Sequence, residues 1–204
     1  MSCVAGASRA ELRRRRITDA ARKLFIANGF HATGIAQIAR ESGVAVGQIY
    51  RDFAAKEEIV AALIHTDCVR LLQFESLDHA IRVNDSTAVQ CWIRNFVEPI
   101  DIDDSRMFAE IVAESARNPR MAGIFTALQD NLRAHILAAL ALLAPGEALE
   151  RRRAGVADVL MTVSLGLTHY QLMRPDTDLA EMVDTLAALI DAHVDGLMNE
   201  VIAR

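Results

Sequence analysis

The side chains that could catalyse a reaction do not form a recognisable catalytic motif in this sequence. It has no Gly-rich phosphate loop, no G-x-S-x-G, no H-E-x-x-H and no cluster of Cys and His. The histidines also lack the spacing of metal ligands; they are His31, His65, His79, His135, His169 and His193. We therefore expect a protein that is not an enzyme and that holds neither a metal nor a cofactor.

The charged side chains suggest a different chemistry, because they are unevenly distributed. Residues 1–60 hold 10 Lys/Arg and 6 Asp/Glu, a net charge of +4, whereas the remaining residues hold 12 basic and 21 acidic side chains, a net charge of −9. A basic segment on an acidic chain predicts that this segment meets a polyanion and that the rest does not. A solvated basic tail is the alternative.

Four consecutive arginines, Arg13 to Arg16, stand out in the basic segment. They could form an extension that reaches phosphates or an adjacent minor groove of DNA. They could equally form an ordinary solvated face of a helix. The sequence leaves both interpretations open.

Two short helices are predicted to position the polar residues of the basic segment. Residues 35–42 and 46–53 have helical spacing, and Gly43 between them allows the left-handed backbone of a tight turn. If Val44 and Ile49 are buried, the second helix keeps an outward face that fits the major groove. That face consists of Val46, Gly47, Gln48 and Arg51.

The rest of the chain is also expected to be helical, which makes the fold all-α. Only 4 prolines and 10 glycines interrupt 204 residues, of which 52% are apolar. Ser8-x-x-Glu11, Asp85 and Asn118-Pro119 have the pattern of helix starts. Nine helices are predicted, over about residues 9–28, 35–42, 46–53, 56–82, 86–99, 103–118, 119–144, 147–174 and 178–204.

The segment from Arg16 to Lys56 resembles the DNA-binding domain of the tetracycline-repressor (TetR) family. The residues that carry the resemblance keep the family's order and spacing. They are Ala20-Ala21, Leu24-Phe25, Gly29-Phe30, Ala32-Thr33, Ile38-Ala39, Gly43-Val44, Ile49-Tyr50, Phe53 and Lys56-Glu57. Residues 114–119 also resemble the end of the family's sixth helix.

The resemblance implies a helix-turn-helix domain of three helices over residues 1–55. Residues 56–204 would then form a helical domain for ligand binding and dimerisation. The implied function is a sequence-specific transcriptional regulator, in the family's usual mode a repressor, which a small-molecule effector releases from a palindromic operator in double-stranded DNA. The alternative is a similar DNA-binding protein without a small-molecule inducer, controlled by a protein partner.

The resemblance also implies which residues contact DNA. Thr33, Tyr50 and Lys56 correspond to family positions that contact phosphates, and Gln48 can bond an adenine edge. A buried aromatic is the alternative role for Tyr50. Ala45 replaces the usual Ser or Thr cap of the second short helix, which costs about 1 kcal/mol. The predicted DNA-binding residues are Thr33, Gln37, Val46, Gly47, Gln48, Tyr50, Arg51 and Lys56.

The last two predicted helices are expected to form a homodimer. The apolar stripe of residues 178–204 is wide enough to face both its own core and a partner. Small residues in 147–174 would allow close approach, so that two pairs form a four-helix bundle about a two-fold axis. An ordinary monomeric core is the alternative.

The middle helices contain the candidate ligand-binding residues, for which a plain core role is the alternative. We expect a mainly apolar or amphipathic ligand. Glu110 is expected on a solvated face beside Arg106, and Glu114 at the border of an apolar arc, paired with Arg117. The candidates are Trp92, Phe96, Met107, Phe108, Ile111, Glu114, Phe125, His169, Tyr170 and Met173.

Cysteine usage and hydropathy indicate the compartment. The sequence has an odd number of cysteines and no C-x-x-C pair, which is typical of a protein from a reducing compartment. The three are Cys3, Cys68 and Cys91. Buried thiols or a redox sensor could account for them. The N-terminal charges follow a short, weakly apolar stretch, the wrong order for a signal peptide, and no apolar run is long enough to span a membrane. We therefore expect a cytoplasmic protein with no membrane partner.

Overall fold

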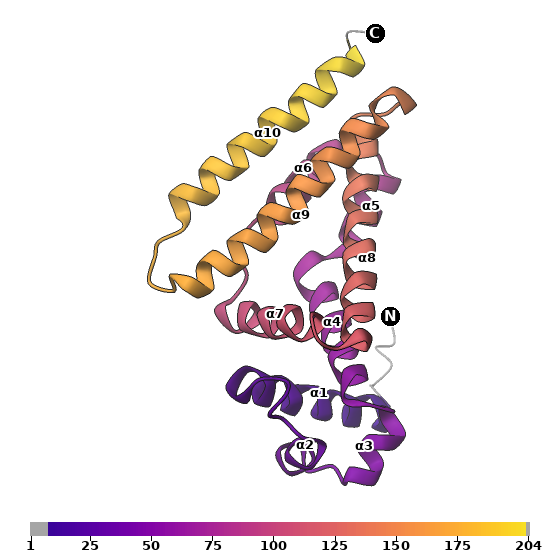
Figure 1. Cartoon of the computed structure of the whole chain (residues 1–204). Helices are drawn as coiled ribbons and strands as arrows, with labels where there is room; N and C mark the ends of the chain where they lie inside the picture. The colour runs from indigo at the N-terminus through magenta and orange to yellow at the C-terminus, as the bar shows by residue number, and fades with distance from the viewer. Residues whose placement is uncertain (1–7, 203–204) are drawn as a thin grey trace, which may run out of the picture. The chain divides into compact units, whose positions relative to one another are not determined.

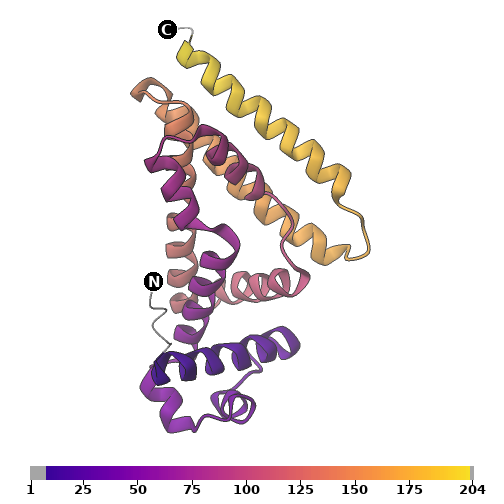
Figure 2. The same cartoon turned by 180° about the vertical axis from the view of Figure 1, so that it is seen from behind.

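The part of the chain that the computed structural model describes, residues 8–202, consists of helices joined by short connections (Figures 1 and 2). These residues form ten α-helices and one short 3₁₀ helix, Glu147–Leu149, with no strand, which confirms the all-α class. The α-helices are α1 Arg9–Asn28, α2 Ile35–Ser42, α3 Val46–Asp52, α4 Lys56–Leu72, α5 Phe74–Arg82, α6 Ser86–Asn95, α7 Ile102–Ser115, α8 Pro119–Leu143, α9 Glu150–Met173 and α10 Ala180–Ile202. Cys3 and the side chains of Cys68, Val201 and Ile202 lie outside the described part.

The single helix predicted over residues 56–82 is wrong, because it is divided into α4 and α5. Gln73 between them has a left-handed backbone, with φ 46° and ψ 46°, which ends the helical path. The Leu72 carbonyl at this break accepts a hydrogen bond of 2.6 Å from the Trp92 indole N–H. A side chain 20 residues away thus satisfies a backbone group that the interrupted helix leaves open.

The predicted helix starts are confirmed where polar side chains mark them. Ser8 and Glu11 form a reciprocal capping box, with hydrogen bonds of 2.6 and 3.1 Å. The Asp85 carboxylate accepts from the Ala88 N–H at the start of α6. The Asn118 side chain accepts from the Met121 N–H at the start of α8. Each side chain satisfies a backbone N–H that has no partner within its own helix.

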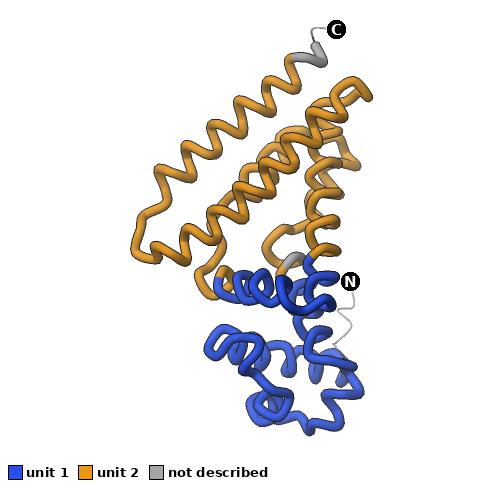
Figure 3. Tube along the Cα trace, viewed as in Figure 1, with its two compact units in different colours: residues 1–66, 106–125 blue, residues 67–105, 126–204 orange. Residues whose placement is uncertain are grey.

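The chain packs into two compact units (Figure 3). The first combines residues 1–66 with residues 106–125, and the second combines residues 67–105 with residues 126–204. The predicted boundary after residue 55 does not coincide with these units, so the functional division at that point stays a prediction. The first unit joins the three N-terminal helices to the end of α7 and the start of α8.

Each unit has its own apolar core. Ile17, Phe25, Ile38, Ile49 and Ile59 are fully buried in the first unit, where Met107, Ile111 and Met121 of α7 and α8 join them. This burial excludes water from the packed faces of α1, α2 and α3 and so stabilises their arrangement. The main core of the second unit is contributed by α5, α6, α8, α9 and α10.

In the second unit, α9 and α10 run antiparallel (Figures 1 and 2). Ile190, Val194 and Leu197 of α10 are buried in the unit's core. Leu189 of α10 and Val159 of α9, by contrast, are 57% and 58% exposed. Among the helices of residues 8–202, none combines the length and apolarity that a membrane crossing requires.

Candidate nucleic-acid interface

The turn between α2 and α3 has the geometry that the sequence predicts. Gly43 ends α2 in the left-handed region, with φ 65° and ψ 24°. The Arg16 side chain of α1 donates to the Ser42 carbonyl at 2.6 Å. A Cβ atom at Gly43 would lie 2.9 Å from Nη2 of Arg16. Glycine therefore suits this position mainly for its left-handed backbone conformation, and a larger residue would also displace the end of the Arg16 side chain.

The outward face of α3 exposes most of the residues predicted for base contact. Val46 is 41% exposed and Tyr50 is 55% exposed, while Gly47 and Arg51 are also exposed and Gln48 is partly so. Ile49 on the opposite face is fully buried. The buried alternative for Tyr50 is therefore wrong. The face combines a guanidinium, an amide, a phenol and a small apolar patch, which are groups that contact phosphates and base edges.

Thr33 and Gln37 use their side chains within the protein. The Thr33 hydroxyl, in a side chain only 1% exposed, donates to the Leu24 and Gly29 carbonyls. Oε1 of Gln37 accepts from the Gly34 N–H at 2.6 Å, at the start of α2. The structure thus places both side chains in the support of the turn between α1 and α2, and not on the exposed face of α3.

Lys56 at the start of α4 also points into the first unit. Its ammonium group donates to the carbonyls of Phe30, at 2.6 Å, and Thr33, at 2.8 Å, and lies 4.0 Å from the centre of the Phe30 ring. Burial lowers the pKa of this ammonium, while the charges of Glu57 and Glu114 work in the opposite direction. Lys56 therefore holds the segment that follows α1.

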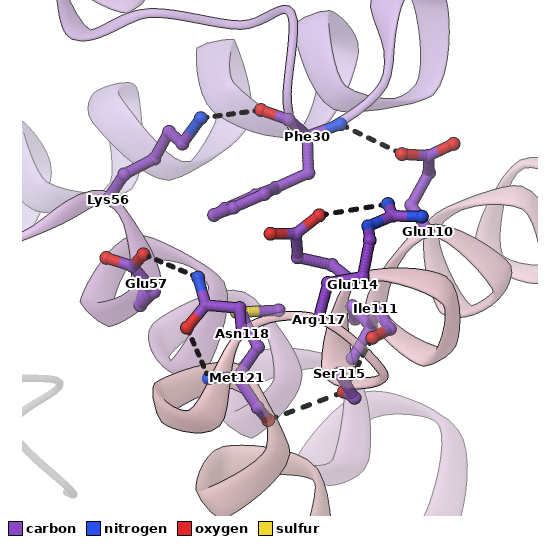
Figure 4. Close-up of polar contacts among 10 residues, drawn as sticks. All are labelled: Phe30, Lys56, Glu57, Glu110, Ile111, Glu114, Ser115, Arg117, Asn118 and Met121. Atoms are coloured by element: carbon purple, nitrogen blue, oxygen red, sulfur yellow. Dashed lines mark hydrogen bonds and ion pairs between the residues drawn. The ribbon is translucent and has the colours of Figure 1, made fainter.

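Glu110 of α7 holds the same segment from its other side. Its carboxylate accepts from the Phe30 N–H at 2.9 Å, so that Phe30 lies between Lys56 and Glu110 (Figure 4). A Cβ atom at Gly29, where φ is 81°, would lie only 3.0 Å from Oε2 of Glu110. The expectation that Glu110 lies on a solvated face is therefore wrong, because its carboxylate is bonded to the Phe30 backbone. Since 80 residues separate the partners, no local spacing could have revealed it.

The predicted pairing of Glu114 with Arg117 is confirmed. The Glu114 side chain is buried, and its carboxylate lies 3.2 Å from the Arg117 guanidinium (Figure 4). The amide of Asn118 donates to the Glu57 carboxylate at 3.0 Å. Polar groups at the end of α7 and in the turn that follows it are therefore bonded to each other and to α4 within the first unit.

The four consecutive arginines divide between two roles. Arg13 binds the Asp52 carboxylate of α3 through Nε and Nη2, Arg14 donates to the Asp52 carbonyl, and Arg16 donates to the Ser42 carbonyl. These three arginines therefore hold the C-terminal ends of α2 and α3. Arg15 is exposed and lies 4.0 Å from Asp19, as expected for a solvated helix face. Neither interpretation of the run anticipated the contacts with α2 and α3.

The predicted ligand-binding residues are distributed over both units. In the first unit, Met107 and Ile111 are buried in the core, and the rings of Phe108 and Phe125 lie 5.8 Å apart. These contacts are those of packed core residues. Glu114, described above, is the fifth candidate in this unit.

In the second unit, the remaining candidates have varied surroundings. Trp92 and Phe96 are buried with their rings 5.8 Å apart. His169 bonds the Leu165 carbonyl within α9, Tyr170 lies beneath Arg174, and Met173 is exposed. An open cavity of about 450 Å³ in this unit is lined by none of the predicted residues. Its lining is Glu98, Pro99, Gln171, Pro175, Thr177, Asp178, Leu179, Ala180, Val183 and Asp184.

Comparison with known proteins places this arrangement among bacterial regulators. The family model described as "Bacterial regulatory proteins, tetR family" matches residues 17–63. A second model, for the C-terminal part of BetI-type transcriptional repressors, matches residues 87–199, more than half of the chain. Together the two models cover the helix-turn-helix and most of the helical body.

Individual relatives agree with the family models. The HTH-type transcriptional regulator UidR of Escherichia coli (strain K12) is 30% identical over 114 residues, 54% of this chain and 56% of that protein. The chain thus spans about half the length of this curated relative.

Solved structures have the same fold. Salmonella enterica GusR has a TM-score of 0.64 at 23% identity, covering 94% of this chain and 98% of that one. A transcriptional regulator from Pseudomonas aeruginosa PAO1 has a TM-score of 0.69 at 16% identity, covering 97% and 95%.

The helical fold and the exposed face of α3 define a helix-turn-helix regulator of transcription. The chain belongs to the tetR family of bacterial regulatory proteins, since a family model covers more than half of its length.

Proposed function

We propose that this regulator is a repressor that binds a palindromic operator as a homodimer and is released by a mainly apolar or amphipathic small molecule. The observation that carries the proposal is the exposed face of α3, where Gln48, Tyr50 and Arg51 stand beside the apolar Val46. Arginine and tyrosine bind phosphates, and glutamine bonds the adenine edge. Val46 fits against a thymine methyl group. A cytoplasmic location follows from binding of bacterial DNA.

Thr33, Gln37 and Lys56 support DNA binding indirectly in this proposal. Their side chains bond the backbone between α1 and α2, so they hold α2 and α3 in place beneath the DNA. The remaining predicted DNA-binding residues contact the duplex themselves. This division separates residues that set the base preference from residues that preserve the shape of the reading surface.

Homodimerisation fits the exposed surface of α9 and α10. Val159 and Leu189 are exposed apolar side chains, and a Cβ atom at Gly155 or Gly166 of α9 would meet only open space. A partner copy can approach such a surface closely and bury its apolar area. Dimerisation also brings two copies of α3 to a palindrome, which raises affinity beyond that of one copy.

The effector is proposed to bind among the aromatic and methionine side chains of the helical body. Trp92, Phe96 and Tyr170 of the second unit supply apolar surface, to which Tyr170 adds a hydroxyl, as ligand sites commonly do. The effector must bind better to a form of the dimer that fits the operator poorly. A coupling of about 1–3 kcal/mol would lower operator affinity by about 5- to 150-fold.

The test begins with selection of operators by the purified protein from random duplex DNA. A palindromic consensus is expected, together with affinity that falls steeply as salt rises. Lipophilic compounds are then titrated into the complex while DNA release and Trp92 fluorescence are followed. If no sequence is enriched, the DNA-binding proposal fails. If compounds bind the protein without altering operator affinity, control by a protein partner replaces control by a small molecule.

A further inference from the structure

The C-terminal ends of α2 and α3 are bonded to α1 by arginine side chains. Nη2 of Arg16 donates to the Ser42 carbonyl at 2.6 Å, at the end of α2. At the end of α3, Arg14 donates to the Asp52 carbonyl and Arg13 binds the Asp52 carboxylate. Carbonyl groups in the last turn of a helix have no partner within that helix, so arginines of α1 satisfy them from outside.

The contacts at the end of α3 hold this helix in a defined orientation. Nε of Arg13 donates to Oδ2 of Asp52 at 2.6 Å, and Nη2 donates to Oδ1 at 2.8 Å. A bidentate pair of this kind fixes the plane of a carboxylate as well as its position. The Arg14 guanidinium lies 4.1 Å from the centre of the ring of Phe53, a residue that is only 2% exposed. The end of α3 is therefore attached to α1 through a carboxylate, a carbonyl and an aromatic ring.

The helix α3 has little apolar anchorage of its own. Of its seven residues, all within the described part of the chain, only Ile49 is buried. Ala45 at its N-cap makes no side-chain capping bond. A helix of about two turns that is anchored by one side chain can tilt about that point unless contacts at its ends prevent it. The arginines of α1 supply such contacts at the C-terminal end.

We propose that Arg13, Arg14 and Arg16 are positioning residues that fix the tilt of α3 against α1 before DNA is bound, and thereby raise affinity for the operator above affinity for random DNA. The proposal rests on the proposed function and concerns how its reading helix is aligned. Hydrogen bonds to base edges weaken steeply with misalignment, whereas phosphates are available along any duplex. Alignment of α3 therefore affects specific binding far more than non-specific binding.

Arg15 provides a contrast within the same run of arginines. Its side chain is 78% exposed and lies 4.0 Å from Asp19, one turn further along α1. An exposed pair of this kind contributes little to the folded structure. Arg15 therefore serves as the matched control, since this contact lies within α1.

The experiment compares the affinity of the full-length protein for its selected operator with its affinity for random duplex DNA of the same length. Arg13→Lys preserves the charge but loses the bidentate pair, so it is expected to lower the ratio of the two affinities by about 10-fold. Asp52→Asn should lower the ratio similarly, although it removes a negative charge that repels phosphates. The double variant should lose no more than either single variant, because both changes break one interaction. A loss of folded protein would lower both affinities by the same factor, so the ratio reports the alignment of α3 and not stability.

Two further variants keep the test decisive. Arg15→Lys, the same change at the exposed arginine, should leave the ratio unchanged. Arg13→Gln should lower the ratio as Arg13→Lys does, while the slope of log affinity against log salt stays that of the wild type, because no phosphate contact is lost. A ratio that is unchanged in Arg13→Lys and Asp52→Asn, or a slope that falls by about one in Arg13→Gln, overturns the proposal while operator binding stands. If the wild type selects no operator, the proposed function itself fails.

Discussion

At the scale of single residues, the structure separates side chains that face outward from those that hold the backbone. Gln48, Tyr50 and Arg51 lie on the outer face of α3, whereas Lys56 is bonded to two carbonyl groups. The sequence pattern cannot make this distinction, because a lysine ammonium can donate either to a phosphate or to a backbone carbonyl. The direction of the side chain decides it.

Lys56 provides a test of this distinction. We expect Lys56→Ala to weaken binding to all duplexes by loosening the segment around Phe30, without changing the salt dependence, because its ammonium is already bonded within the protein. Arg51→Ala should instead reduce the slope of log affinity against log salt by about one. Titrations at several salt concentrations measure both slopes. A slope that falls equally in both variants would show that Lys56 contacts a phosphate.

Ala45 offers a gain in stability at the start of α3. It occupies the N-cap position with an extended backbone, φ −61° and ψ 141°, and makes no side-chain capping bond. Ala45→Ser should raise the free energy of unfolding by about 1 kcal/mol, because serine can accept from a free backbone N–H. Ala36→Ser within α2 is the control and should not stabilise, since serine is a poorer helix former than alanine. Urea denaturation measures both; equal midpoints for Ala45→Ser and wild type would refute the expectation.

Asp52 should make stability depend on pH in acid. Hydrogen bonds from Arg13 lower its pKa below the ordinary value of 3.8. A depressed folded-state pKa stabilises the protein above the unfolded-state pKa, and this contribution is lost as pH falls through the folded-state pKa. The wild type should therefore exceed Asp52→Asn in free energy of unfolding at neutral pH, and the difference should shrink below pH 3.8. Denaturation at a series of pH values checks this, and a difference independent of pH would contradict it.

At the scale of elements, the helix-turn-helix depends on helices distant in sequence. The end of α7 and the start of α8 share the first unit and its core with α1, α2 and α3. Glu110 and Lys56 bond the N–H and the carbonyl of the same residue, Phe30. The backbone between α1 and α2 is therefore held from both sides.

Substitution of Glu110 should show how much its contact with the Phe30 N–H stabilises the folded protein. We expect Glu110→Ala to cost about 1–3 kcal/mol of stability, because the partly buried Phe30 N–H loses its acceptor. Glu110→Gln retains an acceptor and should restore much of the loss. Glu41→Ala, which removes an exposed pair with Lys23 at 3.5 Å, is the control and should cost little. Hydrogen exchange at the Phe30 amide gives a local readout. Unchanged protection of this amide in Glu110→Ala would show that the contact does not stabilise the segment around Phe30.

At the scale of the whole molecule, the proposed dimer depends on which apolar residues of α10 remain exposed. Regular spacing alone does not distinguish which of its Leu, Ile and Val residues stay exposed. In the structure, Ile190 is buried in the core of its own chain, while Leu189 beside it is exposed. A charge at Ile190 would therefore disturb the fold, whereas a charge at Leu189 tests association.

Leu189→Glu should convert the protein to monomers without unfolding it. A buried charge at the interface opposes association, and operator affinity should fall in parallel because one copy binds weakly. Val83→Glu, at the 56% exposed residue that follows α5, is the control and should leave association unchanged. Sedimentation velocity and circular dichroism measure mass and helicity. A wild type that sediments as a monomer at micromolar concentration would contradict the dimer.

The sequence by itself determined the local features of this protein. The all-α class, the glycine turn at Gly43, the caps at Ser8 and Asp85, and the family resemblance of residues 16–56 all follow from short-range patterns. Helical spacing and capping act between residues three or four positions apart, so they can be recognised in a linear sequence. The exposed face of α3 followed from the same periodicity.

Only the tertiary structure decided how distant side chains act on these elements. Arg13 binds Asp52 across 39 residues and Glu110 binds the Phe30 N–H across 80, and neither spacing has a sequence pattern. The break at Gln73 likewise accompanies a hydrogen bond from Trp92, in another helix. Such contacts depend on how whole helices pack, because packing brings together groups that no local periodicity connects.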